Sequence, residues 1–306
     1  MTKLNNIMIL GVGAVGAIVA GKLADAGYTV DILCDAERKA RYTKDNFIIN
    51  GKPYVFNYVT KEEVTTPPDF LIVATKHYAL KEAIAGFQKI VGQHTLVMSL
   101  LNGTDSEAII GDVVGREKMI PAFIVKTDST KTGNSTVYAS SGVIHFGEAD
   151  KSKTQRLDDI AALFSAIGMD YQIEEDILKE QWWKYMLNIG MNQVSAVMGA
   201  TYGVFHTNAD IRQLASKAMH EAVLVAKAKG IALNDAMIPG VFEVIDKLAP
   251  EGMTSMMQDV SAGRKTEADM LAGQLIALGK EYGIPTPVNE VLYLQLKIIE
   301  AMSGVA

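Results

Sequence analysis

Three glycines near the amino end of the chain have the spacing that lets a backbone approach a phosphate group. They belong to the turn Gly11-Val12-Gly13-Ala14-Val15-Gly16. In such a turn the first glycine permits a tight bend, the second admits a pyrophosphate, and the third lets a helix pack against a strand. The N–H groups at the start of the following helix favour an anion. The turn therefore predicts that the chain binds a dinucleotide.

Three polar residues follow other apolar runs and could face the same ligand. Asp35 closes the run 28–34, about 20 residues after the glycines, where an acid holds ribose hydroxyls. Lys76 and Asn102 come directly after two further apolar runs. Each of these two could instead cap the next helix or face water. Because ligands bind beyond the carboxyl ends of parallel strands, the recurrence of such residues favours a binding site.

A narrow polar stripe marks one later helix. Lys184, Asn188 and Asn192 are four residues apart, so they share a helix face, while the other faces are apolar. Leaving such groups buried without partners costs about 1–3 kcal/mol each. A hydrogen-bond network between domains would satisfy them, but beside a dinucleotide site a polar substrate is the better partner.

A third group of polar residues spans 254–269 and contains Ser255 and Glu267. Charged residues in the middle of a helix usually form a solvated face. Nothing in this segment alone distinguishes Glu267.

The helices and strands predicted to position these residues differ between the two parts of the chain. Apolar runs at 7–10, 28–34, 54–59, 69–75, 95–101, 119–125 and 142–147 alternate with helical segments at 17–26, 37–44, 78–91 and 105–114. This alternation predicts a doubly wound parallel sheet, completed by a helix at 153–167 and a strand at 170–173. After residue 174 only helices are expected, at 177–198, 208–229, 234–248, 254–282 and 287–302. The sequence thus predicts an α/β domain over 1–174 and an all-α domain over 175–306.

The composition argues against several classes of binding partner. The 306 residues carry a net charge of −6, which gives no basic footprint for nucleic acid or an anionic membrane. Cys34 is the only cysteine and the five histidines have no metal-ligand spacing, so neither disulfides nor a metal site is expected. No run of 18 apolar residues predicts a membrane span. These features are typical of a cytoplasmic protein that binds a small molecule.

Taken together, these residues resemble the ketopantoate reductase family over essentially the whole chain. The resemblance rests on the turn 11–16, Thr75-Lys76, Leu101-Asn102-Gly103, Trp182-x-Lys184-x-x-x-Asn188, Asn192, Ser255-Met256-x-Gln258-Asp259 and Thr266-Glu267. It implies a Rossmann-type domain and a helical domain with the active site in the cleft between them. It also implies reduction of ketopantoate to pantoate by NADH or NADPH.

The resemblance assigns a role to each candidate residue. Lys184 hydrogen-bonds the ketone oxygen and supplies the proton, and Glu267 orients the substrate hydroxyl and the lysine. Ser255, Asn188 and Asn192 hold polar substrate oxygens, whereas Lys76 and Asn102 lie between cofactor and substrate. A cation beside the ketone stabilises the alkoxide that forms in the transition state.

Two positions depart from the family pattern. Asp35 stands where the family commonly has an arginine that grips the 2′-phosphate of NADPH, so the sequence predicts a preference for NADH. Arg38 and Lys39 could restore phosphate binding. Gly252 replaces an asparagine that contacts substrate in some members, which leaves other branched or aromatic 2-oxo acids open as substrates.

Two other functions remain open from the sequence. The β-hydroxyacid dehydrogenases also place a lysine and an asparagine on a helix, but after a glycine-rich approach, which residues 179–183 lack. A nucleotide-sensing Rossmann protein would not need Lys184 or Glu267. The resemblance leaves the oligomeric state open, including a homodimer.

Overall fold

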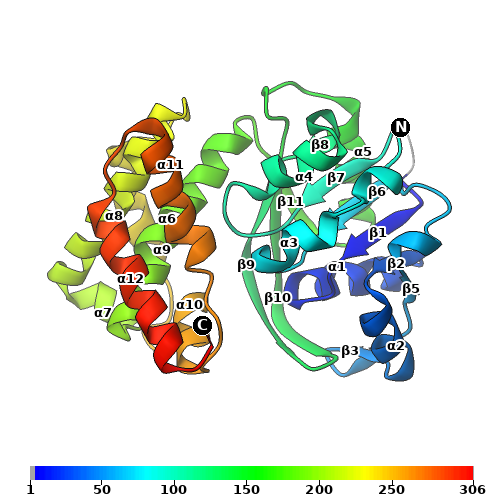
Figure 1. Ribbon diagram of the computed structural model, residues 1–306, viewed down its shortest axis with the longest axis horizontal. Coiled ribbons are helices and arrows are strands. Elements are labelled where there is room, and N and C mark those ends of the chain that lie inside the picture. Colours follow the sequence, from blue (N-terminus) through cyan, green and yellow to red (C-terminus); the bar gives the residue numbers. More distant parts are fainter. Residues whose placement is uncertain (1–3, 306) are drawn as a thin grey trace. The chain divides into compact units, whose positions relative to one another are not determined.

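The computed structural model describes residues 4–305, which divide into two compact units (Figure 1). The division falls between Ile177 and Leu178, whereas the sequence analysis placed the boundary at residue 174. Helix α6 (Ile177–Met198) begins at this division. No helix among residues 4–305 is long and apolar enough to cross a membrane.

The first unit is built on a six-stranded parallel sheet with the strand order β5-β2-β1-β6-β7-β8. The strands are β1 (Ile7–Leu10), β2 (Val30–Leu33), β5 (Asn57–Val59), β6 (Phe70–Val73), β7 (Leu96–Ser99) and β8 (Met119–Ile120). The chain starts at β1, winds outward through β2 and β5, and then returns to wind the other way. This is the doubly wound order of a dinucleotide-binding sheet.

Helices and single helical turns connect these strands. The helices are α1 (Ala14–Asp25), α2 (Ala36–Lys44), α3 (His77–Ile84), α4 (Ser106–Val114) and α5 (Gln155–Ala166), and the 3-10 turns are η1 (Lys61–Glu63), η2 (Phe87–Lys89) and η3 (Arg116–Lys118). Every residue of β1 and β6 is buried because both faces of the sheet are covered. The predicted continuous helix at 78–91 is wrong, since α3 ends at Ile84 and a separate turn follows.

A second sheet packs against α1; the sequence predicted parts of its strands, at 119–125, 142–147 and 170–173, but placed them in the single parallel sheet. It contains β3 (Phe47–Ile49), β4 (Lys52–Tyr54), β9 (Ala122–Thr132), β10 (Ser135–Phe146) and β11 (Asp170–Ile173). Strands β9 and β10 form a long antiparallel hairpin. Its outer half, residues 125–132, alternates between exposed and half-buried positions and is rich in Lys, Asp, Ser and Thr, so it gives no apolar pattern in the sequence.

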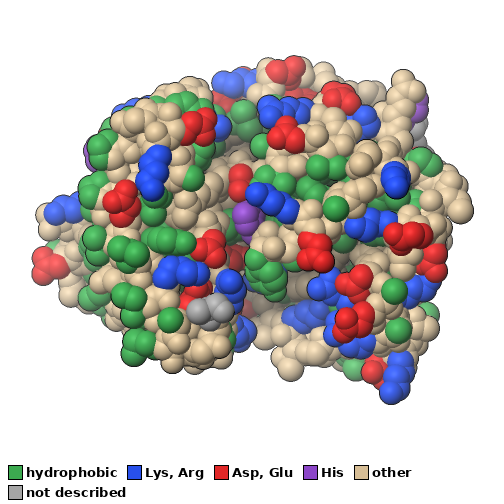
Figure 2. All heavy atoms as spheres, in the orientation of Figure 1, with side chains coloured by type: hydrophobic (Ala, Val, Ile, Leu, Met, Phe, Trp, Pro, Cys, Tyr) green, Lys and Arg blue, Asp and Glu red, His purple; other side chains and the backbone are tan. Residues whose placement is uncertain are grey.

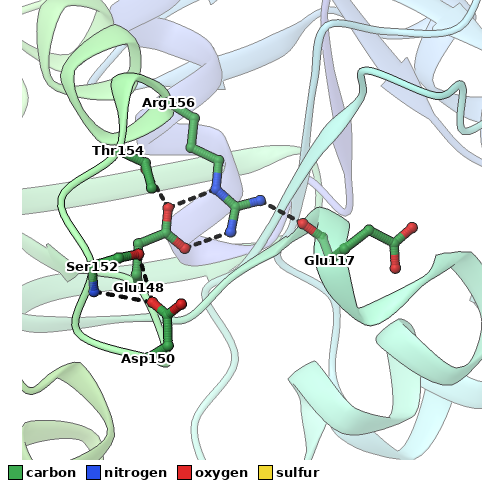
Figure 3. A network of polar contacts seen from close by, with 6 residues as sticks. All are labelled: Glu117, Glu148, Asp150, Ser152, Thr154 and Arg156. Carbon is green, nitrogen blue, oxygen red and sulfur yellow. Dashed lines mark hydrogen bonds and ion pairs between the residues drawn. The ribbon is translucent and has the colours of Figure 1, made fainter.

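A buried ion pair fixes the loop between β10 and α5 (Figure 3). The Glu148 side chain is only 4% exposed and accepts hydrogen bonds from Arg156, with Nε to Oε1 at 2.6 Å, and from the Thr154 hydroxyl. Arg156 also donates to the carbonyl oxygen of Glu117. Although burial acts to raise it, the pKa of Glu148 lies below its usual value because Arg156 and Thr154 stabilise the carboxylate.

The second unit is helical throughout its described residues. After α6 come α7 (Tyr202–Thr207), α8 (Ala209–Ala228), the 3-10 turn η4 (Asp235–Met237), α9 (Ile238–Ile245), α10 (Ser255–Ser261), the π-helix η5 (Asp269–Gly273), α11 (Gln274–Tyr282) and α12 (Pro287–Met302). Its core is separate from those of the first unit and includes Trp182, Tyr185 and Phe205, all nearly inaccessible to solvent.

The predicted fold class is confirmed: a Rossmann-type sheet is followed by an all-helical unit. The bounds of α6 and α12 agree with the predicted ranges. The prediction of one helix over 254–282 is wrong, because α10 ends before Gly263, whose φ of +60° turns the chain. Residues 262–268 therefore form a non-helical link.

Candidate active site

The sheet order brings the four predicted strand-end positions to one edge of the first unit. Strands β2, β1, β6 and β7 are consecutive neighbours, and all run in the same direction. Asp35, Gly11, Lys76 and Asn102 follow these strands in that order. With neighbouring strands about 4.8 Å apart, four strand ends span roughly 15 Å, which suits an extended ligand.

Two glycines of the turn are required by the protein's own packing. A Cβ atom at Gly16 would lie 1.9 Å from the carbonyl oxygen of Gly11, so no other residue fits there. Gly11 has a φ of +94°, and a Cβ at this position would lie 2.9 Å from the carbonyl oxygen of Ala74. These contacts bind β1, α1 and the end of β6 tightly together.

Gly13 is different, because the protein does not fill the space beside it. A Cβ atom there would meet only the carbonyl oxygen of Ala74, at 3.7 Å, which is an ordinary contact. Gly13 precedes α1 without a side-chain cap, and no acidic residue lies in the first turn of that helix. The positive end of α1 and the open side of Gly13 fit a pyrophosphate.

A lysine from the hairpin supports this turn from a distant part of the sequence. The Lys131 Nζ atom donates a hydrogen bond to the carbonyl oxygen of Val12 at 2.7 Å and lies 5.8 Å from the centre of the Tyr42 ring. Burial, together with the positive charges of Arg41 and Arg38, lowers the pKa of Lys131. The sequence analysis missed Lys131 because it lies on the polar outer half of β9, beyond the predicted run 119–125.

Asp35 lies at the end of β2 as predicted, and its carboxylate already has partners. It accepts a hydrogen bond from the backbone N–H of Arg38 at 2.7 Å, which caps α2. The Arg38 guanidinium also lies 3.2 Å from Asp35, and both side chains are about half exposed. Lys39 is paired with Glu63 at 2.5 Å. Both nearby cations suggested by the sequence therefore have acidic partners.

In the second unit the polar stripe on α6 lies in buried surroundings. Asn188 and Asn192 are 8% and 7% exposed, and Lys184 is half-buried. Within residues 4–305, no hydrogen bond joins either asparagine amide to another residue. By contrast, Gln193 on the same helix donates to Asn289 at 2.9 Å. Across the described part of the chain, the two asparagine side chains are therefore nearly buried without a protein partner, and of the Gln193 amide only the Oε1 atom is left without one.

Two buried hydrogen bonds join α6 to the segments that contain the other predicted residues. The Tyr185 hydroxyl, next to Lys184 in sequence, donates to the carbonyl oxygen of Leu271 in the π-helix at 2.6 Å. Further along α6, Ser195 accepts from the Thr254 hydroxyl at 3.1 Å, directly before Ser255. Ser255 is exposed at the start of α10. The second unit therefore anchors both predicted segments on the helix that carries Lys184.

Glu267 lies on the non-helical link, half-buried and two residues before the start of the π-helix at Asp269. Single π-helical turns are rare and often accompany functional sites. This local geometry was not visible in the sequence, where the segment read as part of a continuous helix.

Comparison with known proteins decides the family. The family model described as "Ketopantoate reductase PanE/ApbA" matches residues 7–151, and "Ketopantoate reductase PanE/ApbA C terminal" matches residues 176–300. The chain belongs to the ketopantoate reductase family. It is therefore an NAD(P)-dependent oxidoreductase acting on a CH–OH group.

Individual relatives span almost the full chain. The 2-dehydropantoate 2-reductase of Pyrococcus horikoshii is 26% identical over 301 residues, covering 97% of this chain and 98% of the relative. Among solved structures, D-mandelate dehydrogenase with NADH and anilino(oxo)acetate has a TM-score of 0.84 at 23% identity, covering 98% and 99% of the two chains. A dimeric ketopantoate reductase from Staphylococcus aureus has a TM-score of 0.77 at 18% identity, covering 97% and 99%.

Among residues 4–305, no group of three or more His, Cys, Asp or Glu side chains is placed to hold a metal ion. The surface in Figure 2 mixes acidic and basic side chains over the face shown.

Proposed function

We propose that the chain reduces the ketone of a 2-oxo acid, with ketopantoate as substrate and pantoate as product. The observation that carries this proposal is the pair of partnerless amides on α6, beside Lys184 in helical spacing. Amides in largely buried surroundings are usually hydrogen-bonded, so Asn188 and Asn192 favour a polar ligand beside this face of α6. A 2-oxo acid with a hydroxyl group offers the oxygen atoms that they need.

The reaction follows from the proposed position of Lys184. When bound at the glycine turn, a reduced nicotinamide would supply a hydride to the ketone carbon, so that negative charge would develop on the ketone oxygen. The Lys184 ammonium group hydrogen-bonds that oxygen, stabilises its growing negative charge and transfers a proton to it. Glu267 orients the substrate hydroxyl and the lysine, and Ser255 binds the carboxylate. Lys76 and Asn102 lie between cofactor and substrate in this proposal.

Replacement of Lys184 tests the assignment most directly. Lys184→Ala should lower kcat and kcat/KM together by about 100-fold or more, because the lost contact stabilises the transition state. Cofactor affinity should survive, since the glycine turn lies in the other unit. Lys217→Ala is the matched control, as Lys217 is an exposed lysine on α8. A Lys184→Ala enzyme with nearly normal kcat would refute the role of the lysine.

A second substrate class has a specific observation in its favour. A Cβ atom at Gly252 would lie 2.8 Å from the Tyr202 ring, so the asparagine of some family members does not fit here. Without that contact, the alternative substrate is another branched or aromatic 2-oxo acid, as for a D-2-hydroxyacid dehydrogenase. Assays of ketopantoate, a branched 2-oxo acid and an aromatic 2-oxo acid will rank these substrates by kcat/KM.

We propose NADH as the preferred cofactor. The Asp35 carboxylate is suited to accept hydrogen bonds from the adenosine ribose hydroxyls, whereas a 2′-phosphate would bring a second anion to the same place. The engagement of Arg38 by Asp35 and of Lys39 by Glu63 supports this preference. A cytoplasmic location remains a prediction of the sequence.

We also propose that the chain forms a homodimer through one face of α12. Four apolar side chains of this helix are strongly exposed and lie at helical spacing: Val291, Leu294, Ile298 and Met302, at 56%, 60%, 59% and 82% exposure. Figure 2 shows hydrophobic side chains gathered over α12. Light scattering should give a dimer mass for the wild type and a monomer mass for Leu294→Glu. A wild-type monomer at micromolar concentration would contradict the proposal.

A further inference from the structure

The last turn of α12 carries a buried carboxylate that no substrate role uses. Glu300 is 2% exposed. Its Oε1 atom accepts hydrogen bonds from the Thr266 backbone N–H at 2.8 Å and from the Thr266 hydroxyl at 2.6 Å. Its Oε2 atom accepts from Lys297 at 2.7 Å. Both carboxylate oxygens are therefore engaged, and one of them binds the residue immediately before Glu267.

Thr266 transmits this contact into the link that carries Glu267. Its hydroxyl donates to Glu300 and accepts a hydrogen bond from the backbone N–H of Ala268 at 3.2 Å. The residues on both sides of Glu267 are thus fixed by one side chain. Removing the Thr266 hydroxyl would leave the Ala268 N–H without this acceptor and would remove one of the two hydrogen bonds that Thr266 donates to Glu300.

The same helix also holds the chain after Glu267. The Tyr293 hydroxyl donates to Asp269 Oδ1 at 2.8 Å, and Lys297 lies 3.5 Å from the same oxygen. Lys297 therefore stands between two carboxylates, that of Glu300 and that of Asp269. Although burial acts to raise it, the pKa of Glu300 lies below its usual value because Lys297 and Thr266 stabilise its charged form.

We propose that Glu300 is a positioning residue, which holds Glu267 in the geometry that the reduction requires. The proposal rests on the function proposed above. Displacing a catalytic group by about 1 Å costs up to about 100-fold in rate, so a carboxylate that fixes the neighbouring backbone controls turnover without touching substrate. The contact joins residues 34 positions apart, which makes the alignment of Glu267 depend on the end of α12.

A second buried carboxylate supplies a matched control at the other end of the same helix. Glu221 is 6% exposed and accepts hydrogen bonds from the backbone N–H groups of Val288 and Asn289 at 2.8 and 3.0 Å. It thus anchors the start of α12 as Glu300 anchors its end. Glu221→Gln should weaken the unit without disturbing residues 266–269.

The test compares two substrates in the full-length enzyme. For each variant, kcat/KM is measured with ketopantoate and with a 2-oxo acid that lacks the hydroxyl, and the ratio of the two is reported. Glu300→Gln and Thr266→Val should lower this ratio by about 10-fold or more, mainly through kcat, as should Glu267→Ala. Thr266→Ser, which keeps the hydroxyl, should restore it. Glu221→Gln should leave the ratio unchanged even where its melting temperature falls.

Hydrogen exchange gives a readout that does not depend on turnover. Backbone amides of residues 264–273 should exchange faster in Glu300→Gln than in Glu221→Gln. Unchanged exchange, an unchanged substrate ratio in Glu300→Gln, or the same loss of ratio in Glu221→Gln would each overturn the positioning role. A wild type that reduces neither acid would overturn the proposed function and the catalytic part of this role. Hydrogen exchange would still show whether Glu300 holds residues 264–273 in place.

Discussion

The glycine turn of the first unit and the Glu267 segment of the second are held in place in different ways. The turn is fixed by backbone atoms close in space and mostly close in sequence, since Gly16 fits against the carbonyl oxygen of Gly11. The Glu267 segment is fixed by side chains from α12, above all by Glu300. The turn depends on glycines, which have no side chain, whereas the Glu267 segment depends on the buried carboxylate of Glu300.

This difference determines what a change of residue can do. In the turn an added methyl group collides with backbone, which cannot move without disturbing β1 and α1. In the Glu267 segment the loss of one hydrogen bond leaves the helices in place and releases only the link between them. We therefore expect all-or-none effects in the turn and graded, substrate-dependent effects near Glu267.

The largest expected effect comes from Gly16. In Gly16→Ala the new Cβ would lie 1.9 Å from the Gly11 carbonyl oxygen, so the turn must open and dinucleotide binding should be lost. Gly13→Ala is the matched variant, because its Cβ would make only an ordinary contact at 3.7 Å. The Gly13→Ala variant should melt at nearly the wild-type temperature. It should bind the dinucleotide about 10-fold or more weakly, because the added methyl group occupies the space proposed for the pyrophosphate.

Thermal melting and a cofactor titration by fluorescence will separate these two outcomes. Wild-type affinity in Gly13→Ala would show that the open side of the turn does not face the ligand. A stable Gly16→Ala protein with normal affinity would contradict the close packing itself.

The contrast also explains which parts of the molecule the sequence could predict. The glycine turn, the strand ends and the stripe Lys184–Asn188–Asn192 are encoded locally, by spacing within one or two elements. The role proposed for Glu300 is not encoded locally, because the sequence predicts a helix at 287–302 and does not indicate which residues it contacts. Likewise only the apolar inner halves of β9 and β10 were predicted; the outer half of the hairpin is largely polar, so the contact of Lys131 with Val12 could not be anticipated.

The helix break before Glu267 was missed for a related reason. Residues 262–268 contain Arg264, Lys265 and Glu267, which are good helix formers, and only Gly263 signals an end. Tertiary contacts with α12 override this local preference. The sequence therefore suggested Glu267 only through the family resemblance, whereas the stripe on α6 was evident from its spacing.

A smaller effect is expected from Asp35, whose carboxylate is proposed to make the glycine-turn site favour NADH over NADPH. Asp35→Arg should shift the ratio of kcat/KM values from NADH towards NADPH, because it replaces a repulsive carboxylate with a cation that binds the 2′-phosphate. A shift of about 10-fold or more is expected. The ratio is measured for both cofactors at saturating 2-oxo acid. A wild type that prefers NADPH, or an unchanged ratio in Asp35→Arg, would show that Asp35 does not contact the ribose.

The smallest effect on activity is expected from Glu148, a buried carboxylate that fixes a loop carrying none of the proposed site residues (Figure 3). Glu148→Gln should lower the stability of the first unit by about 1–3 kcal/mol, because Arg156 loses a charged partner. It should leave the ratio of kcat/KM values for the two 2-oxo acids unchanged. That outcome would distinguish a structural carboxylate from Glu300.

The loss of stability in Glu148→Gln should depend on pH in one direction. The pKa of Glu148 is lower in the folded protein than its usual value of 4.5, so the ionised carboxylate stabilises the fold above about pH 4.5. This contribution is lost as the pH falls through the folded-state pKa. Melting temperatures of wild type and Glu148→Gln should therefore differ most near neutral pH and converge as the solution becomes acidic. A difference that grows on acidification would show that the charged form of Glu148 does not stabilise the loop.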